Sequence, residues 1–112
     1  MTVVNVKAAL ELLEGDRELY RRAVTVYLQD TPMQLAKLET WLKTNDLKGA
    51  ERRAHALKSA SRTVGAEDLG ALCARLESSV HEGNLVEAEK LFEAVRLELD
   101  KVRVALETEL AA

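Results

Sequence analysis

Residues 47–64 read LKGAERRAHALKSASRTV, and their apolar and small side chains recur at alternating spacings of three and four residues. That spacing places them on one side of an α-helix that packs lengthwise against other helices. Gly65 ends this pattern, and a second stripe of the same kind follows on residues 69–80. The expected buried positions are Leu47, Ala50, Ala54, Leu57, Ser61, Val64, Leu69, Leu72, Leu76 and Val80.

The chain after this pair predicts one further long helix. Gly83 and Asn84 separate it from the preceding stripe, and its own stripe extends over residues 85–110. Because the connections between these helices are short, neighbouring helices must be antiparallel. The expected core residues of the last helix are Leu85, Ala88, Phe92, Val95, Leu99, Val102, Leu106 and Leu110.

Three shorter helices are predicted before residue 47. The first covers residues 6–13 with Asn5 as its N-cap, and the second covers residues 16–29. Thr31 and Pro32 predict a new helix start, because proline suits the first helical position. The expected buried residues of these helices are Val6, Ala9, Leu10, Leu13, Leu19 or Tyr20, Ala23, Val26, Tyr27, Leu35, Leu38 and Leu42.

Composition agrees with long helices in one domain. The 112 residues are 47% hydrophobic and 31% charged, with one proline and five glycines, which leaves few of the turns that a β fold needs. We therefore expect an all-α fold, an antiparallel up-down four-helix bundle with short additional N-terminal helices, and a single domain over residues 1–112.

Charge and cysteine content exclude several classes of function. The net charge is −3 and charges of both signs are interspersed, which argues against a nucleic-acid or anionic-membrane surface. Cys73 has no second cysteine for a disulfide, and two histidines with one cysteine make a poor zinc set. No apolar run approaches ~20 residues and no signal-peptide pattern begins the chain, so we expect a cytoplasmic protein.

His55 is the strongest candidate for chemistry. It follows the core position Ala54, so it should lie beside the core stripe and face solvent, one turn from Lys58. A neutral imidazole is a good nucleophile near neutral pH, and a lysine ammonium would offset the charge of an incoming phosphoryl group. Ser59 is small enough for a partner surface to approach.

Glu77 is the candidate partner of His55. If the chain turns at Gly65, residue 55 comes level with residue 76 or 77 on the next helix. A carboxylate that binds one ring nitrogen would fix the tautomer and leave the other nitrogen free to attack.

Each feature also has an ordinary structural interpretation. A lone histidine on a helix flank is more often plain surface, and Lys58 and Arg62 would by default be solvated. Cys73 suits a small core residue, and His81 suits the C-terminal end of a helix dipole. Periodicity alone therefore predicts a helical bundle without a function.

The ordered motifs resemble those of histidine phosphotransfer domains. Residues 54–60, AHALKSA, are followed by Val64-Gly65-Ala66 and then by Leu69, Leu72, Cys73, Leu76 and Glu77. The family pattern is similar to A-H-x-L-K-G-x-A, a Gly-Ala turn, and L-x-x-x-C-x-x-L-E. The resemblance extends upstream to residues 12–20 and 31–38, so it spans nearly the whole chain.

The resemblance implies that His55 is phosphorylated, at the solvent-facing Nε2, by a receiver-domain aspartyl phosphate and passes the group to another receiver in a phosphorelay. Lys58 would assist electrostatically and Glu77 would orient the imidazole, although glutamine is frequent at that position. Ser59 stands where the family commonly has glycine. Arg52, Ser59 and Arg62 are the expected docking residues.

The resemblance also implies a phosphocarrier without autonomous kinase activity. The chain has no Gly-rich phosphate loop, and we expect no cofactor on it and Mg²⁺ on the partner receiver. The expected partners are response-regulator receiver domains, including those of hybrid sensor histidine kinases, with the chain itself a monomer.

Three other interpretations remain open from the sequence. A helical interaction module without phosphotransfer activity is the main alternative, although intact His55 and Lys58 argue against it. A metal- or haem-binding bundle would need His55 and His81 to converge in the interior. The dimerising histidine helices of a sensor kinase would need contacts from a second chain.

Overall fold

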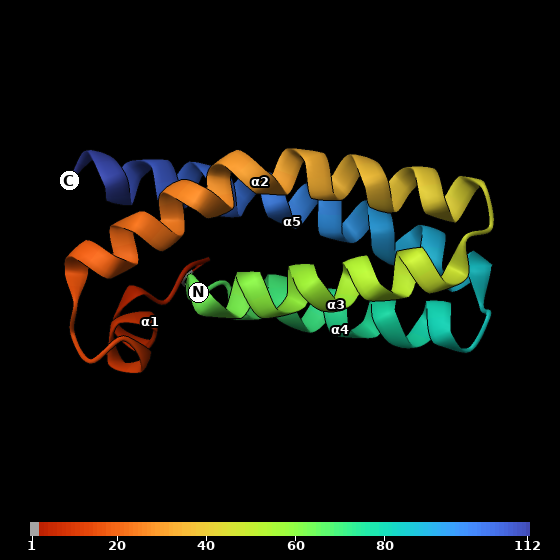
Figure 1. Ribbon diagram of the computed structural model, residues 1–112, viewed down its shortest axis with the longest axis horizontal. Coiled ribbons are helices and arrows are strands. Elements are labelled where there is room, and N and C mark those ends of the chain that lie inside the picture. The colour runs from red at the N-terminus through yellow and green to blue at the C-terminus, as the bar shows by residue number, and fades with distance from the viewer. Residues whose placement is uncertain (1–2) are drawn as a thin grey trace.

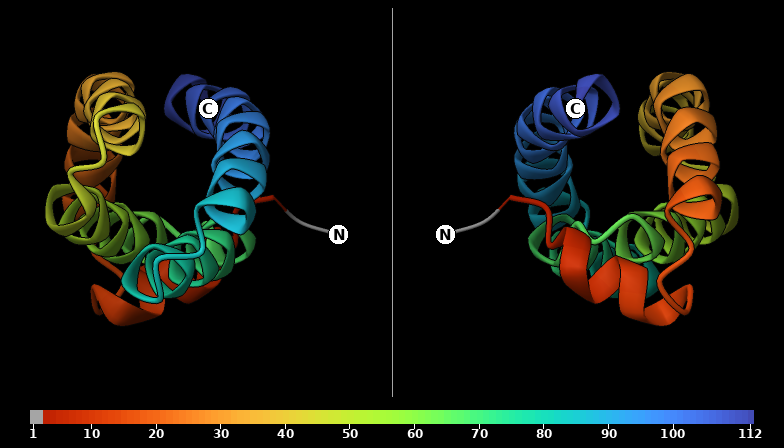
Figure 2. Two further views of the ribbon diagram at one scale, coloured as in Figure 1. Left: turned by 90° about the vertical axis from the view of Figure 1, so that its right-hand side faces the viewer. Right: turned by 90° about the vertical axis from the view of Figure 1, so that its left-hand side faces the viewer.

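The computed structural model describes residues 3–112, and four long helices of this part form an antiparallel up-down bundle (Figure 1). The bundle is 40 Å long and about 20 Å across. A short helix, α1, lies across one end of it (Figure 2). No helix within residues 3–112 is long and apolar enough to cross a membrane. The helices are α1 (Val6–Leu12), α2 (Arg17–Lys43), α3 (Leu47–Thr63), α4 (Glu67–His81) and α5 (Leu85–Ala111).

Side-chain caps determine where four of the helices begin. Asn5, Asp16, Asp46 and Asn84 each accept a hydrogen bond from the backbone N–H three residues later, at 3.0–3.2 Å. Such caps satisfy backbone donors that have no partner within the helix. The N-cap predicted at Asn5 is thereby confirmed.

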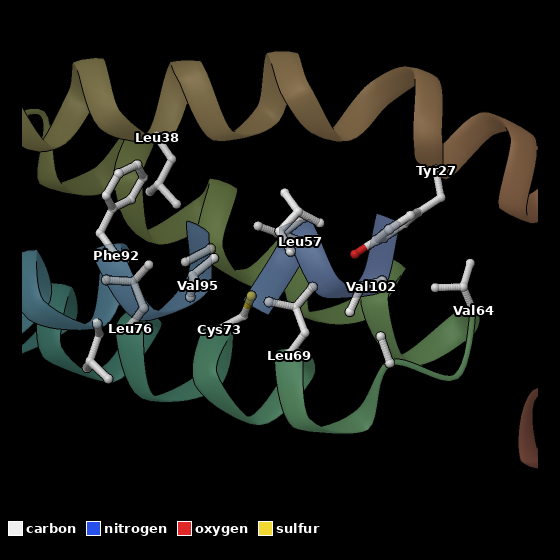
Figure 3. Packing of buried hydrophobic residues seen from close by; sticks show 14 of the residues in the cluster. Tyr27, Leu38, Leu57, Val64, Leu69, Cys73, Leu76, Phe92, Val95 and Val102 are labelled. Atoms are coloured by element: carbon white, nitrogen blue, oxygen red, sulfur yellow. The ribbon is translucent and has the colours of Figure 1, made fainter. Parts of the chain in front are cut away.

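Side chains from all four long helices meet in the core (Figure 3). The stripes predicted for α3, α4 and α5 are confirmed, with Leu47, Leu72, Leu85 and Leu110 only partly buried at the margins. Cys73 is fully buried among these side chains, as expected of a small core residue.

The predicted break at Thr31 and Pro32 is wrong, because α2 continues through both residues. Pro32 is exposed, and Thr31 is buried in the core instead of capping a new helix. Proline lacks the N–H that would bond to the carbonyl of Leu28 and crowds that carbonyl, so the helix bends on the N-terminal side of Pro32 (Figure 1). Burial of Tyr27 and Leu38 on either side of the proline supports the continuous helix.

The predicted burial of Val26 is also wrong, since its side chain is 60% exposed. The core face of this part of α2 instead contains Tyr20, Val24, Tyr27 and Thr31, at spacings of four, three and four residues. Of the predicted alternatives Leu19 and Tyr20, it is Tyr20 that is buried, and Ala23 is only partly covered. Val26 therefore belongs to a flank of α2 and not to its core face.

The turn between α3 and α4 is fixed by close contacts with the N-terminal segment. Gly65 has a φ of +90° and its carbonyl accepts a hydrogen bond of 2.8 Å from the Asn5 N–H. A Cβ at residue 65 would lie 2.4 Å from the Asn5 carbonyl oxygen, so only glycine fits. The Tyr20 hydroxyl also donates to the Val64 carbonyl at 3.0 Å. These contacts hold the α3–α4 turn against Asn5 and α2.

Candidate functional site

His55 lies on the outer flank of α3, where its imidazole side chain is 59% exposed. The buried neighbours Ala54 and Leu57 hold that turn of the helix against the core. The backbone beneath His55 is therefore rigidly placed, while the ring itself is open to an approaching molecule. This is the position that the sequence predicted.

Glu77, on α4, lies directly across from His55 and contacts two side chains of α3. Its Oε2 atom is 2.8 Å from His55 Nδ1, and its Oε1 atom accepts a hydrogen bond from Lys58 Nζ at 2.7 Å. The predicted proximity of residues 55 and 77 is confirmed. One carboxylate thus links both candidate residues of α3.

The charge state of Glu77 decides how His55 is oriented. Partial burial on its own would raise the pKa of Glu77, but hydrogen bonds from Lys58 and His55 outweigh burial and lower that pKa overall. The carboxylate is therefore ionised and can only accept hydrogen bonds. It follows that His55 Nδ1 donates its proton to Glu77, so in the neutral ring the lone pair is on Nε2.

The predicted docking residues share the exposed stripe of α3 with His55. Lys48, Arg52, Ser59 and Arg62 follow one another with His55 at spacings of four or three residues, and all are exposed. The side chain of Arg62 lies over Gly70 of α4. Among the described residues, the side chains of Arg52, Ser59 and Arg62 form no hydrogen bond or ion pair with those of His55, Lys58 and Glu77.

A groove between α2 and α3, which the sequence did not reveal, borders the same face. Its lining is mainly apolar and includes Val26, together with Ala56 and Ala60 next to His55 and Ser59. The one sequence feature that could have indicated this groove is Val26, an apolar residue that lies one position away from the buried residues of α2. The complete lining is Leu19, Arg22, Ala23, Val26, Tyr27, Asp30, Thr31, Gln34, Ala56, Leu57, Ala60, Thr63 and Val64.

A second imidazole–carboxylate pair also bridges α3 and α4. His81 Nδ1 lies 3.1 Å from Glu51 Oε1, one helical turn from the pair of His55 and Glu77. The two histidines lie on the surface, not in the interior that a haem or metal bundle would need. No group of three His, Cys, Asp or Glu side chains within residues 3–112 is arranged to hold a metal ion.

The sequence of this helical bundle also matches a known protein family. The model of the Hpt domain matches residues 22–105, three quarters of the chain. The chain belongs to the Hpt domain family. Histidine phosphotransfer in a phosphorelay is therefore its function, and Hpt domains act there with response-regulator receiver domains.

Two solved structures resemble this Hpt domain over almost its whole length. Histidine-containing phosphotransfer protein B (HptB) from Pseudomonas aeruginosa PAO1 is 26% identical, with a TM-score of 0.89, covering 97% of this chain and 95% of that one. The HPT domain of an Hpt sensor hybrid histidine kinase from Shewanella is 24% identical, with a TM-score of 0.87 and coverage of 97% and 94%, and it supports the fold. No curated protein sequence matches the chain.

Proposed function

We propose that His55 is the phosphorylated residue of this Hpt domain and that Nε2 is the accepting atom. The observation that carries this proposal is the 2.8 Å contact between His55 Nδ1 and the ionised carboxylate of Glu77. The His55 side chain is nevertheless 59% exposed. This arrangement gives the imidazole a fixed tautomer and leaves its nucleophilic nitrogen facing outward.

The transfer step requires one nucleophile from this chain. The Nε2 lone pair attacks the phosphorus of a receiver aspartyl phosphate, the bond from phosphorus to the aspartyl oxygen breaks, and the aspartate leaves as a carboxylate. The proton on Nδ1 stays in its hydrogen bond to Glu77, which stabilises the positive charge that develops on the ring. The reverse step returns the group to a receiver, and the receiver would contribute Mg²⁺.

Lys58 is placed to offset negative charge without blocking the ring. Its ammonium is anchored on Glu77 at 2.7 Å, and its side chain is only 19% exposed. The cation therefore stays beside His55 at little further cost in side-chain entropy. A phosphoryl group on Nε2 would lie near both this ammonium and the guanidinium groups of the α3 stripe.

The receiver would dock on the surface formed by the α3 stripe and the adjoining groove. Ala56 and Ala60 present small side chains beside His55, and exposed Val26 extends the apolar surface onto α2. Arg52 and Arg62 would meet acidic groups around the receiver's aspartate, which favours association and register. We expect the resulting complex to be transient and modest in area.

The same proposal covers assembly and location. The four-helix core is complete within one chain, which supports a monomer acting with receivers, including those of hybrid sensor kinases. The proposed location is the cytoplasm, as expected from the sequence.

The direct test is transfer of labelled phosphate from a phosphorylated receiver to the wild-type chain, His55→Gln and His81→Gln. We expect acid-labile, base-stable label on the wild type and on His81→Gln, and none on His55→Gln. His81 is the matched control because it is also an exposed histidine paired with a glutamate. Absence of label from the wild type with several receivers would instead favour an interaction module without phosphotransfer.

A further inference from the structure

Two imidazole–carboxylate pairs connect α3 and α4, and the histidine belongs to α3 in one pair and to α4 in the other. In one, His55 of α3 contacts Glu77 of α4 at 2.8 Å; in the other, Glu51 of α3 contacts His81 of α4 at 3.1 Å. On each helix the glutamate precedes the histidine by four residues. Glu51 and His55 are therefore neighbours on the same face of α3.

Glu51 is consequently a second carboxylate within reach of His55. Residues four apart on a helix have Cβ atoms about 5–6 Å apart, and a glutamate in that position readily pairs with a cationic or donor side chain. His55 Nδ1 has one proton to donate, so Glu51 and Glu77 compete for it. In the structure Glu51 instead contacts His81, the last residue of α4.

Release of Glu51 would impair His55 in two ways. Pairing with Glu51 would turn the ring along α3, away from the direction set by Glu77 and Lys58. A free carboxylate one helical turn from His55 would also repel a phosphoryl group on that ring, even in a water-like dielectric.

We propose that His81 is a positioning residue that holds Glu51 away from His55, so that Glu77 alone orients the imidazole. This role rests on the proposed function, because it presumes that His55 is the acceptor. His81 itself takes no phosphoryl group in this scheme, and its side chain is 74% exposed because only Nδ1 is engaged.

The test compares phosphoryl uptake from a phosphorylated receiver for four variants. His81→Ala frees Glu51 and should slow uptake roughly threefold to tenfold. His81→Gln keeps a donor for Glu51 and should stay close to the wild-type rate. The double variant Glu51→Gln/His81→Ala should recover that rate, because no charged competitor remains. Arg75→Ala is the matched control, since it removes another exposed pair between helices, with Glu87 at 3.8 Å.

A structural readout separates this role from a simple loss of stability. Nitrogen chemical shifts of the unphosphorylated His55 ring should change in His81→Ala and return in the double variant. An unchanged uptake rate in His81→Ala, or a double variant as slow as the single one, would overturn the role of His81. Those results leave the proposed function intact, whereas lack of uptake by the wild type would remove the proposed function itself.

Discussion

At the scale of single residues, Glu77 has the most consequential contacts of the site because one carboxylate binds both His55 and Lys58. Glu77→Gln keeps an oxygen that can accept from His55 Nδ1 but removes the charge that fixes Lys58 and stabilises a cationic ring. We expect phosphoryl uptake to slow about tenfold, which corresponds to about 1.4 kcal/mol. Rapid-quench measurement with a phosphorylated receiver checks this, and an unchanged rate would show that Glu77 only fastens α4 to α3.

Ser59 tests the docking surface without touching the chemical groups. Ser59→Arg places a bulky side chain one turn from His55 at an exposed helical position, so the fold should be unaffected. We expect binding to a receiver to weaken at least tenfold, measured by calorimetry at fixed ionic strength. Leu97→Arg on α5, which lies diagonally across the bundle from α3, is the control and should bind normally (Figure 2). Equal loss in both variants would point to charge alone and not to docking at Ser59.

At the scale of elements, the α3–α4 pair was predictable because one turn residue determines its register. A glycine between two apolar stripes predicted that residue 55 lies level with residue 76 or 77, and the contact of 2.8 Å between His55 and Glu77 agrees with that register. The helices α3 to α5 were recognisable because nearly every turn supplies a core residue.

The course of α2 and the groove beside it were less predictable. Pro32 is a strong local signal for a helix start, but burial of residues on both sides of it outweighs one missing hydrogen bond. From the sequence, Val26 could lie either on the core face of α2 or on its flank. Only the burial of Val24 and Thr31 shows that the core face passes beside Val26 and leaves it on the flank. Long-range packing therefore overrides the local pattern in this helix. His81, by contrast, is the last residue of α4, as its suitability for the C-terminal end of a helix dipole predicted.

The α3–α4 turn should be the most sensitive connection in the molecule. Gly65→Ala forces an L-residue into a φ of +90° and brings a Cβ to 2.4 Å from the Asn5 oxygen, so we expect a loss of more than about 2 kcal/mol of unfolding free energy. Gly83→Ala is a matched control, because its φ is +73° but no atom lies within 4 Å of the added Cβ. It should lose only about 1 kcal/mol, from backbone strain. Urea unfolding measures both, and equal losses would contradict a role for the Asn5 contact.

At the scale of the whole molecule, three buried side chains make the free energy of unfolding depend on pH in alkaline solution. Burial raises the pKa of the Cys73 thiol and of the Tyr20 hydroxyl to about 12 each. Burial also raises the pKa of Tyr27, against the opposing effect of its hydrogen bond with Ser61. In the unfolded chain these groups titrate near pH 8.5 for the thiol and near pH 10 for the tyrosines.

The sign of the effect follows from proton counts. Near pH 7 the folded and the unfolded chain both hold all three protons, so these groups do not make the free energy of unfolding depend on pH there. Above that, the unfolded chain loses protons that the folded chain keeps, and stability falls as pH rises, by up to about 1.4 kcal/mol per pH unit for each group. We therefore expect urea midpoints to stay level from pH 7 to 8 and to fall with increasing slope above pH 9.

Tyr27→Phe isolates one of these contributions. The variant should be less stable at pH 7, because Ser61 loses its buried partner at 2.9 Å. Above pH 10, however, its free energy of unfolding should fall less steeply with pH than that of the wild type. The difference in slope should approach about 1.4 kcal/mol per pH unit, the contribution of one proton. The two curves of unfolding free energy against pH should thus converge as the solution becomes more alkaline. Parallel curves would mean that Tyr27 ionises as easily in the folded chain as in the unfolded one, which its burial at the centre of the bundle does not allow.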